Sequence, residues 1–98
     1  MGGPLAPVRL MSIDPNIVYV LTSERHVGRY YTGITTDMDR RLAFHNAGES
    51  RHTASGRPWR VVATITFADP VRAGQFEMYL KTGSGREFAR RHFRQACR

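Results

Sequence analysis

The chain has 98 residues, of which 41% are apolar, so it suits one small folded domain rather than several. Its 15 Lys and Arg outnumber its 8 Asp and Glu, which gives a net charge of +7 and favours a polyanionic partner. Every cation except Lys81 is an arginine, the residue that forks onto phosphate, although a high-GC genome also favours arginine. No apolar run approaches the length of a transmembrane helix. The single cysteine, Cys97, excludes an intramolecular disulfide and is compatible with the reducing cytoplasm.

The start of the chain, MGGPLAPVRL, is rich in glycine and proline. It is too short and too weakly apolar for a signal peptide. We therefore expect residues 1–14 to form a disordered leader, with Met11 as an alternative start, and residues 15–96 to form the folded domain.

The first half of the domain has the pattern of two strands followed by a helix. Two segments rich in β-branched and aromatic residues flank a polar turn that ends in Gly28, so they are expected to pair as an antiparallel hairpin. Thr36 is expected to cap the helix, with Asp39 at the third position of a weak capping box and Gly48 at the C-terminal cap. The expected bounds are 16–22 and 29–35 for the strands and 36–46 for the helix.

The second half begins with a polar, basic loop and continues with one long strand, expected over 59–68. Asp69 and Pro70 suit the cap and first position of a second helix, which is expected to reach about residue 82. Ser84 and Glu87 form a capping box for a third helix that runs toward Cys97. The order β-β-α-β-α-α predicts an α+β fold with a small three-stranded, mainly antiparallel sheet flanked by helices.

Glu77 breaks the apolar pattern of the second helix. Ala73, Phe76 and Leu80 form one apolar stripe, and Glu77 falls on the same face. A buried carboxylate is costly unless it is paired, hydrogen-bonded or bound to a metal. The pattern leaves two alternatives open, an ion pair with Lys81 one turn later or a functional carboxylate.

The first helix places Arg41 and His45 one turn apart on one face. Arg41 can hold a phosphate, and His45 can act as an acid, a base or a phosphate donor. The alternative is a solvated helix face with a surface histidine. The tyrosines of the hairpin are expected to serve packing unless they point into a cleft; they are Tyr19, Tyr30 and Tyr31.

The four histidines of the chain show no metal-ligand spacing. The third helix carries a basic face. The basic face could line a nucleic-acid backbone or simply be solvated. Its members are Arg86, Arg90, Arg91 and Arg94.

Together these residues resemble the GIY-YIG nuclease family. Its two namesake tripeptides would be residues 17–19 (IVY) and 31–33 (YTG) on the two hairpin strands, and Arg41 follows eight residues after the second. The stretches RRLAFHN, RPWRVV and GQFEMYLKTGSGREFARRHF are similar to the small single-domain bacterial members, and the likeness spans about residues 17–93. Two positions depart from the pattern. Ile17 replaces a glycine, and Ile34 replaces a lysine found in relatives such as the excision-repair nuclease subunit.

The resemblance implies metal-assisted hydrolysis of a phosphodiester. Glu77 would be the only protein carboxylate on Mg²⁺ or Mn²⁺. Tyr19, with its pKa lowered by nearby cations, would activate the attacking water as general base. Arg41 would hold the scissile phosphate. The remaining members of the implied catalytic set would position water or phosphate, with the histidine as the alternative base; they are Tyr31 and His45.

The implied partner is nucleic acid, with DNA the expected substrate, DNA repair the expected role, the cytoplasm the expected location and no membrane involved. A chain of this size leaves no room for a separate DNA-reading domain, so a protein partner could supply specificity. The competing hypothesis is a nucleic-acid-binding module with weak or no cleavage. A purely structural interaction domain would not explain Glu77 on an apolar stripe.

Overall fold

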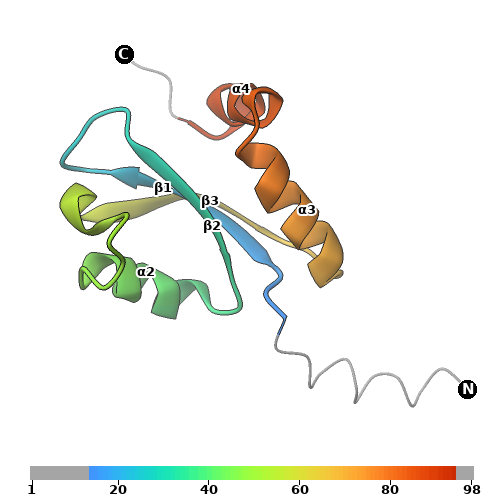
Figure 1. The fold of residues 1–98 in the computed structure, drawn as a ribbon, viewed down its shortest axis with the longest axis horizontal. Coiled ribbons are helices and arrows are strands. Elements are labelled where there is room, and N and C mark those ends of the chain that lie inside the picture. Colours follow the sequence, from blue (N-terminus) through green and yellow to red (C-terminus); the bar gives the residue numbers. More distant parts are fainter. Residues whose placement is uncertain (1–13, 95–98) are drawn as a thin grey trace, which may run out of the picture.

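The computed structural model describes residues 14–94 and has the predicted α+β architecture (Figure 1). All of the predicted leader except residue 14 lies outside the described residues, as does Cys97. The elements follow the predicted order β-β-α-β-α-α with one additional 3-10 turn. They are β1 (Ile17–Ser23), β2 (Tyr30–Thr35), α2 (Met38–Asn46), η1 (Ala54–Gly56), β3 (Trp59–Thr66), α3 (Pro70–Leu80) and α4 (Gly83–His92).

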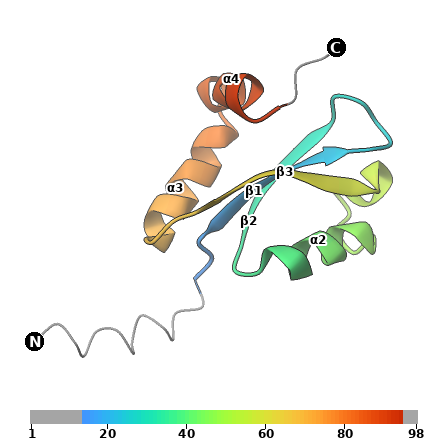
Figure 2. The same cartoon turned by 180° about the vertical axis from the view of Figure 1, so that it is seen from behind.

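The three strands form one antiparallel sheet in the order β2-β1-β3. Helix α2 lies on one side of the sheet, and α3 and α4 lie on the other, as seen from both directions (Figures 1 and 2). The central strand β1 is buried on both faces, because helices cover both. Tyr19 stands opposite Gly33 of β2 and opposite Thr64 of β3 in the register of the sheet.

Alternate residues of β1 serve two separate hydrophobic cores, since successive side chains of a strand point to opposite faces. Val18 and Val20 face α3 and α4, where they pack with Ala73, Leu80 and Ala89. Tyr19 and Leu21 face α2, and the core on that side also contains Tyr31, Met38, Leu42, Trp59 and Val61. The sheet thus separates the tyrosine of the first tripeptide from the larger core and directs it toward α2.

Helix α2 begins one residue later than expected. Asp37 is its N-cap, because the Asp37 carboxylate accepts a hydrogen bond from the Arg40 backbone N–H at 3.1 Å. Thr35 explains the shift, since its hydroxyl accepts the Asp37 backbone N–H and holds the chain in a turn before the helix. The expected cap at Thr36 is therefore wrong. Gly48 follows the helix at φ +80°, which confirms the predicted glycine stop.

The two later helices meet at a sharp corner. Asp69 caps α3 and Pro70 occupies its first turn, as predicted. Helix α3 ends at Leu80, and α4 begins within three residues of that end. The N-cap of α4 is Thr82, whose hydroxyl accepts the Gly85 backbone N–H, so the expected capping box at Ser84 is wrong.

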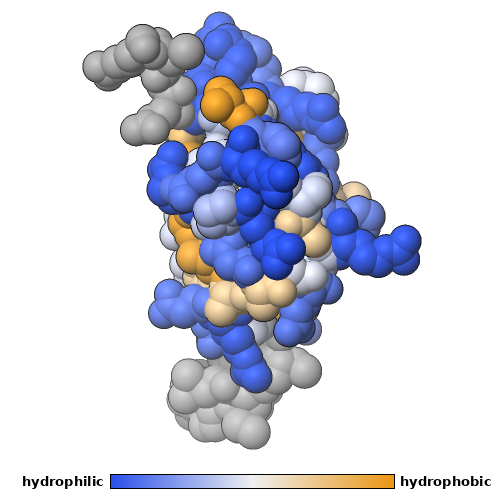
Figure 3. All heavy atoms as spheres, turned by 90° about the vertical axis from the view of Figure 1, so that its left-hand side faces the viewer, coloured by the Kyte–Doolittle hydropathy of each residue, from blue (hydrophilic) through white to orange (hydrophobic). Residues whose placement is uncertain are grey.

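The polar loop between α2 and β3 is more ordered than its composition suggested. It contains the 3-10 turn η1 and is tied to β1 by the Ser23 hydroxyl, which donates to the Gly56 carbonyl at 2.6 Å. The molecular face at this end of the sheet is mostly hydrophilic (Figure 3). Within residues 14–94, no helix is both long enough and apolar enough to span a membrane.

Candidate active site

Tyr19 lies at the centre of the candidate site, on the α2 face of the sheet. Its ring extends across Gly33, its partner on the edge strand β2. A β-carbon at position 33 would overlap the Tyr19 hydroxyl and ring, because it would lie nearer to these atoms than real β-carbons lie to any neighbour. The glycine of the second tripeptide therefore makes room for the tyrosine of the first.

A buried hydrogen-bond chain runs from Tyr19 through His45 to Thr53. The Tyr19 hydroxyl lies 2.8 Å from His45 Nε2, and His45 Nδ1 lies 2.8 Å from the Thr53 hydroxyl. His45 is only 2% exposed and Thr53 is fully buried. The surface alternative for His45 is therefore wrong, although the helix face that carries it was placed correctly.

The protonation states of Tyr19 and His45 determine which group donates in each of these hydrogen bonds. Burial raises the pKa of Tyr19, with a further rise from Tyr31, so the phenol is protonated at neutral pH. Burial and the Arg41 charge lower the pKa of His45, so the imidazole is neutral. Tyr19 therefore donates to His45 Nε2, and His45 donates from Nδ1 to Thr53.

The expectation that cations lower the Tyr19 pKa is wrong for this arrangement. Arg41 does act in that direction, but burial of the phenol outweighs it. The Glu77 charge also raises the Tyr19 pKa. Removal of the Tyr19 proton thus calls for an acceptor, and His45 Nε2 is the group in hydrogen-bond contact.

Tyr31 closes the aromatic cluster on the same face. Its ring centroid lies 5.0 Å from that of His45 and 6.3 Å from that of Tyr19. Trp59 packs edge-on against Tyr31 and donates from Nε1 to the Thr53 carbonyl at 2.7 Å. The structure therefore brings together Tyr19, Tyr31 and His45, whereas Tyr30 packs in the core on the opposite face.

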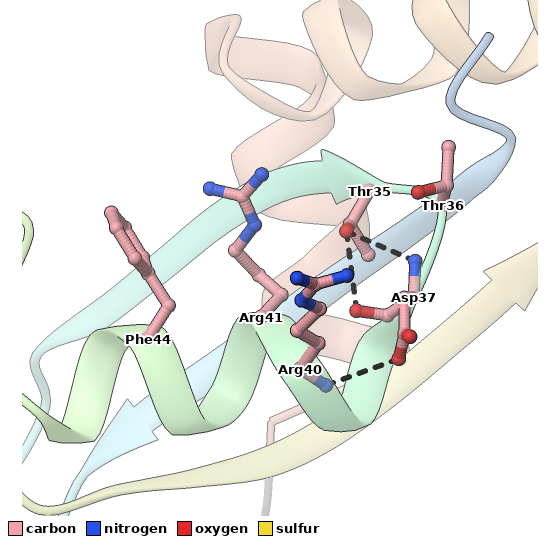
Figure 4. Close-up of a pocket in the computed structure, with 6 residues that line it drawn as sticks. All are labelled: Thr35, Thr36, Asp37, Arg40, Arg41 and Phe44. Carbon is pink, nitrogen blue, oxygen red and sulfur yellow. Dashed lines mark hydrogen bonds between the residues drawn. The ribbon is translucent and has the colours of Figure 1, made fainter. Parts of the chain in front are cut away.

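Arg41 borders the cluster and faces an open cavity of about 500 Å³. Its guanidinium lies 5.1 Å from the centre of the Phe44 ring and projects from α2 toward β2 (Figure 4). Its charge reaches Tyr19 and His45, because it affects the pKa of both. The cavity is lined by Thr35, Thr36, Asp37, Arg40, Arg41 and Phe44.

Glu77 approaches the site from α3, on the other side of the sheet. Its side chain is 14% exposed, and its Oε2 lies 2.6 Å from the Lys81 ammonium, which confirms the ion-pair alternative. Among the described residues, no hydrogen bond joins Glu77 or Arg41 to the aromatic cluster, and their link to Tyr19 is through charge. A metal-binding role for Glu77 stays a prediction.

Sequence reasoning missed Thr53 and Trp59. Thr53 stands in a polar loop with no periodic pattern, so nothing local indicated that it is buried against a histidine eight residues earlier. Asn46 was also missed. Its side-chain oxygen accepts the Trp59 backbone N–H at 2.7 Å and so ties the end of α2 to β3. Its place beside His45 in the RRLAFHN stretch is the signal that could have found it.

Comparison with known proteins agrees with this arrangement. The profile of the family described as the GIY-YIG catalytic domain matches residues 15–91. The chain belongs to the GIY-YIG family. No solved structure is significantly similar to it.

Other GIY-YIG-like proteins of similar sequence are mostly small. A UPF0213 protein of Halalkalibacterium halodurans is 40% identical over 70 residues, which cover 70% of this chain and 74% of that protein. A UPF0213 protein of Streptococcus pneumoniae serotype 4 is 39% identical over 64 residues, 64% of this chain and 65% of that one. The structure-specific endonuclease subunit SLX1 of Meyerozyma guilliermondii is 38% identical over 86 residues, 79% of this chain but only 28% of SLX1.

The donor set of this GIY-YIG domain is compatible with a divalent cation that would take most of its ligands from water and phosphate oxygens. Within the described residues, no three His, Cys, Asp or Glu side chains come together to hold a metal, so these residues would supply at most two such ligands. Mg²⁺ accepts one or two carboxylates together with waters and phosphate oxygens. Glu77 is such a carboxylate, and it already attracts a cation, the ammonium of Lys81. The Lys81 side chain is 54% exposed, so this ion pair is open to solvent.

Proposed function

We propose that the chain is a metal-dependent endonuclease that hydrolyses phosphodiester bonds in nucleic acid, with DNA as the expected substrate. The observation that carries the proposal is the buried chain from Tyr19 through His45 to Thr53, combined with the charges of Arg41 and Glu77 acting on Tyr19. A packing role alone would not require three polar groups to be aligned away from solvent, because each costs free energy to bury.

Tyr19 and His45 would together remove the proton of the attacking water. As the water oxygen attacks phosphorus, the Tyr19 oxygen takes the water proton and the Tyr19 proton passes to His45 Nε2. The bond from phosphorus to the leaving oxygen then breaks, and that oxygen takes a proton from solvent. Thr53 keeps the acceptor nitrogen facing Tyr19, because its hydroxyl accepts the hydrogen on Nδ1.

Arg41 and Glu77 would handle charge at the phosphate. Arg41 faces the open cavity beside the aromatic cluster and can hold a non-bridging phosphate oxygen. Glu77 would hold the divalent cation, Mg²⁺ or Mn²⁺, whose positive charge would stabilise the negative charge developing on the leaving oxygen. Tyr31 packs on His45 and would limit the space available to the water.

The second candidate function is nucleic-acid binding with weak or no cleavage. One observation favours it, because the Lys81 ammonium sits on the Glu77 carboxylate that would hold the metal. If Lys81 stays in place, the domain keeps its basic surface but does not assemble the metal site. Metal-dependent turnover separates the two candidates.

A protein partner and a role in DNA repair in the cytoplasm belong to the same proposal. The relative SLX1 is named a structure-specific endonuclease subunit, which supports a partner that adds specificity. The sequence resemblance to excision-repair relatives supports repair as the setting.

The proposal is tested by incubating the protein with a panel of labelled duplex, branched, flap and single-stranded DNA and RNA, with and without Mn²⁺. We expect cleavage that requires the cation and that falls by at least about 100-fold in Tyr19→Phe, the range lost with one general base. Tyr79→Phe, on the outer part of α3, is the matched control and should cleave like the wild type. Cation-independent products, or equal rates for the two variants, would reject the proposed chemistry.

A further inference from the structure

A second open cavity lies on the other side of the β2 edge from the Arg41 cavity, between β2 and the two C-terminal helices. Its volume is about 460 Å³, and four cationic residues line it, against two in the Arg41 cavity. We call it the basic groove. The side chains that define it are Arg29, Lys81, Arg86 and Arg94, with Tyr30 and Tyr31 along the strand.

Two cations of the basic groove, Arg86 and Arg94, differ from those on the outside of α4. The other two are engaged, because Lys81 pairs with Glu77 and Arg29 donates to the Ser55 hydroxyl and the His52 carbonyl. Arg90 and Arg91 are both held by the Glu87 carboxylate, at 2.6 and 3.1 Å. No carboxylate within residues 14–94 pairs with Arg86 or Arg94. Glu87 therefore offsets part of the charge of Arg90 and Arg91, whereas Arg86 on α4 and Arg94, two residues past the end of α4, carry charge that is available to a ligand.

Arg94 is the more informative of these two cations. Its guanidinium carbon lies 4.3 Å from the centre of the Tyr30 ring, which holds it in the wall of the groove. Its Nε is buried with no hydrogen-bond partner in the described part of the chain. A buried guanidinium N–H without an acceptor is unfavourable, and a phosphate oxygen would satisfy it.

Two residues of the basic groove also contact residues of the candidate active site. Tyr31 lines the groove and also packs on His45 in the aromatic cluster. Lys81 lines the groove and also contacts the Glu77 carboxylate. A polyanion that enters the groove would therefore reach the site where the scissile phosphate is proposed to lie, and it would offer Lys81 new partners in place of Glu77.

We propose that the basic groove binds the sugar-phosphate backbone of a single-stranded segment next to the scissile bond. This inference rests on the proposed function and names its substrate class, nucleic acid with a single-stranded tail or flap. A hollow that combines cations with aromatic rings suits a flexible single strand, whose bases can reach the rings while its phosphates meet the cations. A duplex keeps its bases stacked inside and can offer such a hollow only its phosphates.

Binding without metal tests the groove separately from cleavage. Fluorescence anisotropy would measure the affinity for a labelled 15-nucleotide oligo(dT) and for a blunt duplex of the same length, in EDTA. The groove variant is Arg86→Gln with Arg94→Gln. The control is Arg51→Gln with Arg72→Gln, two exposed arginines outside the groove that remove the same charge.

We expect the groove variant to bind the single strand at least about tenfold more weakly than the control variant does. Its salt dependence should also fall, by a slope of about 1.4, since each lost phosphate contact on a single strand accounts for about 0.7. Arg86→Gln alone, at an exposed position, should give about half of that change if Arg94→Gln perturbs folding. Equal loss of affinity in groove and control variants, or a larger loss for duplex than for single strand, would overturn the inference.

Cleavage assays then separate failure of the groove from failure of the nuclease proposal. With Mn²⁺, wild type should cut tailed duplexes at least about tenfold faster than blunt ones, and the groove variant should lose that preference. Single-strand binding that depends on the groove, in a protein that cleaves nothing, would reject the nuclease and leave the groove in place. Cleavage that prefers blunt duplex would reject the groove and leave the nuclease in place.

Discussion

His45 is held neutral by burial inside the small core beneath α2. The ring has hydrogen-bond partners on both nitrogens, Tyr19 and Thr53, so the neutral form is fully satisfied. Protonation would place a charge in a buried site close to Arg41, which is why the pKa of His45 is lowered. This single residue therefore links the stability of the fold to the proton path of the proposed reaction.

The His45 pKa predicts how stability depends on pH. In the unfolded chain a histidine titrates near pH 6.5, and in the folded chain His45 titrates at lower pH. Between these values the unfolded state binds more protons, so the stabilisation is complete above about pH 6.5 and is lost as pH falls. We expect His45→Gln to remove a slope of up to about 1.4 kcal/mol per pH unit between pH 6.5 and 5. Urea denaturation followed by Trp59 fluorescence measures this.

The control for that experiment is His26→Gln, in the exposed turn between β1 and β2. It should keep the wild-type dependence on pH. If His45→Gln and His26→Gln show the same slope as wild type below pH 6.5, the buried neutral imidazole is not the cause.

The sequence predicted which side chains share a helix face better than it predicted which of them are buried. The types and spacing of Arg41 and His45 indicated a shared helix face, and the structure agrees, because a 3.6-residue period fixes which side chains share a face. The burial of His45 was not predicted, since it depends on Thr53 and Trp59 from a loop and a strand far along the chain. Glu77 shows the opposite case, where the apolar stripe around it correctly indicated a mostly buried carboxylate.

At the scale of elements, the pairing of β1 with β2 sets the geometry of the site. Gly33 on the edge strand leaves the space into which the Tyr19 ring extends. The Tyr19 ring is buried and hydrogen-bonded, so it has little freedom to move away from a larger neighbour. The pairing of β1 with β2 therefore requires a residue without a side chain at position 33.

Gly33→Ala should disturb the site more than the fold around it. We expect a loss of about 1–3 kcal/mol in unfolding free energy, the usual cost of overpacking, together with loss of the proposed nuclease activity. Gly74→Ala on α3 is the matched control, because a β-carbon there meets nothing within 4 Å. Replacing a helical glycine with alanine should stabilise the protein by up to about 1 kcal/mol. Chemical denaturation of both variants measures the difference, and a Gly33→Ala protein as stable as wild type would refute the steric account.

The order of elements was predictable, but some of their ends were not. Asp69 and Pro70 gave the start of α3 because both the cap and the proline point to the same residue. At α2 and α4 two candidate caps stand close together, and the choice between them depends on turns that form outside the helix, such as the one at Thr35. The 3-10 turn η1 was not predicted, since it is held by tertiary contacts such as that of Ser23.

At the scale of the whole molecule, the sheet separates two hydrophobic cores that differ in composition. The core beneath α3 and α4 is built from aliphatic and phenylalanine side chains with Tyr30 at its edge, whereas the core beneath α2 contains Tyr19, which is hydrogen-bonded to His45 and through it to Thr53. Ile34, which departs from the lysine of some relatives, packs with the first of these cores. Its apolar side chain is thus accounted for by packing, on the face opposite Tyr19.

The net charge of +7 predicts that nucleic-acid binding is dominated by phosphate contacts. We expect similar affinity for oligonucleotides of unrelated sequence and a steep fall in affinity as salt is raised, because each contact releases counterions. Anisotropy titrations between 50 and 200 mM salt measure both properties. A strong preference for one sequence that persists at high salt would show that base contacts, rather than phosphate contacts, determine binding.

The central claim is that Glu77 binds the divalent cation on which turnover depends. Glu77→Gln keeps the shape of the side chain and removes its charge, and Glu24→Gln, in an exposed pair with Arg60, is the control. Without metal, the Glu77→Gln protein loses its pair with the half-exposed Lys81 but also relieves a mostly buried charge, so its stability should stay within about 0.5 kcal/mol of wild type. If the carboxylate served only its pair with Lys81, the substitution would spare activity.

The decisive measurement is calorimetric titration of Mn²⁺ into wild type, Glu77→Gln and Glu24→Gln, with turnover measured on the same preparations. We predict that Glu77→Gln alone loses Mn²⁺ binding and loses turnover by orders of magnitude. Equal Mn²⁺ binding and turnover in wild type and Glu77→Gln would contradict the assignment of the metal to Glu77 and the mechanism built on it.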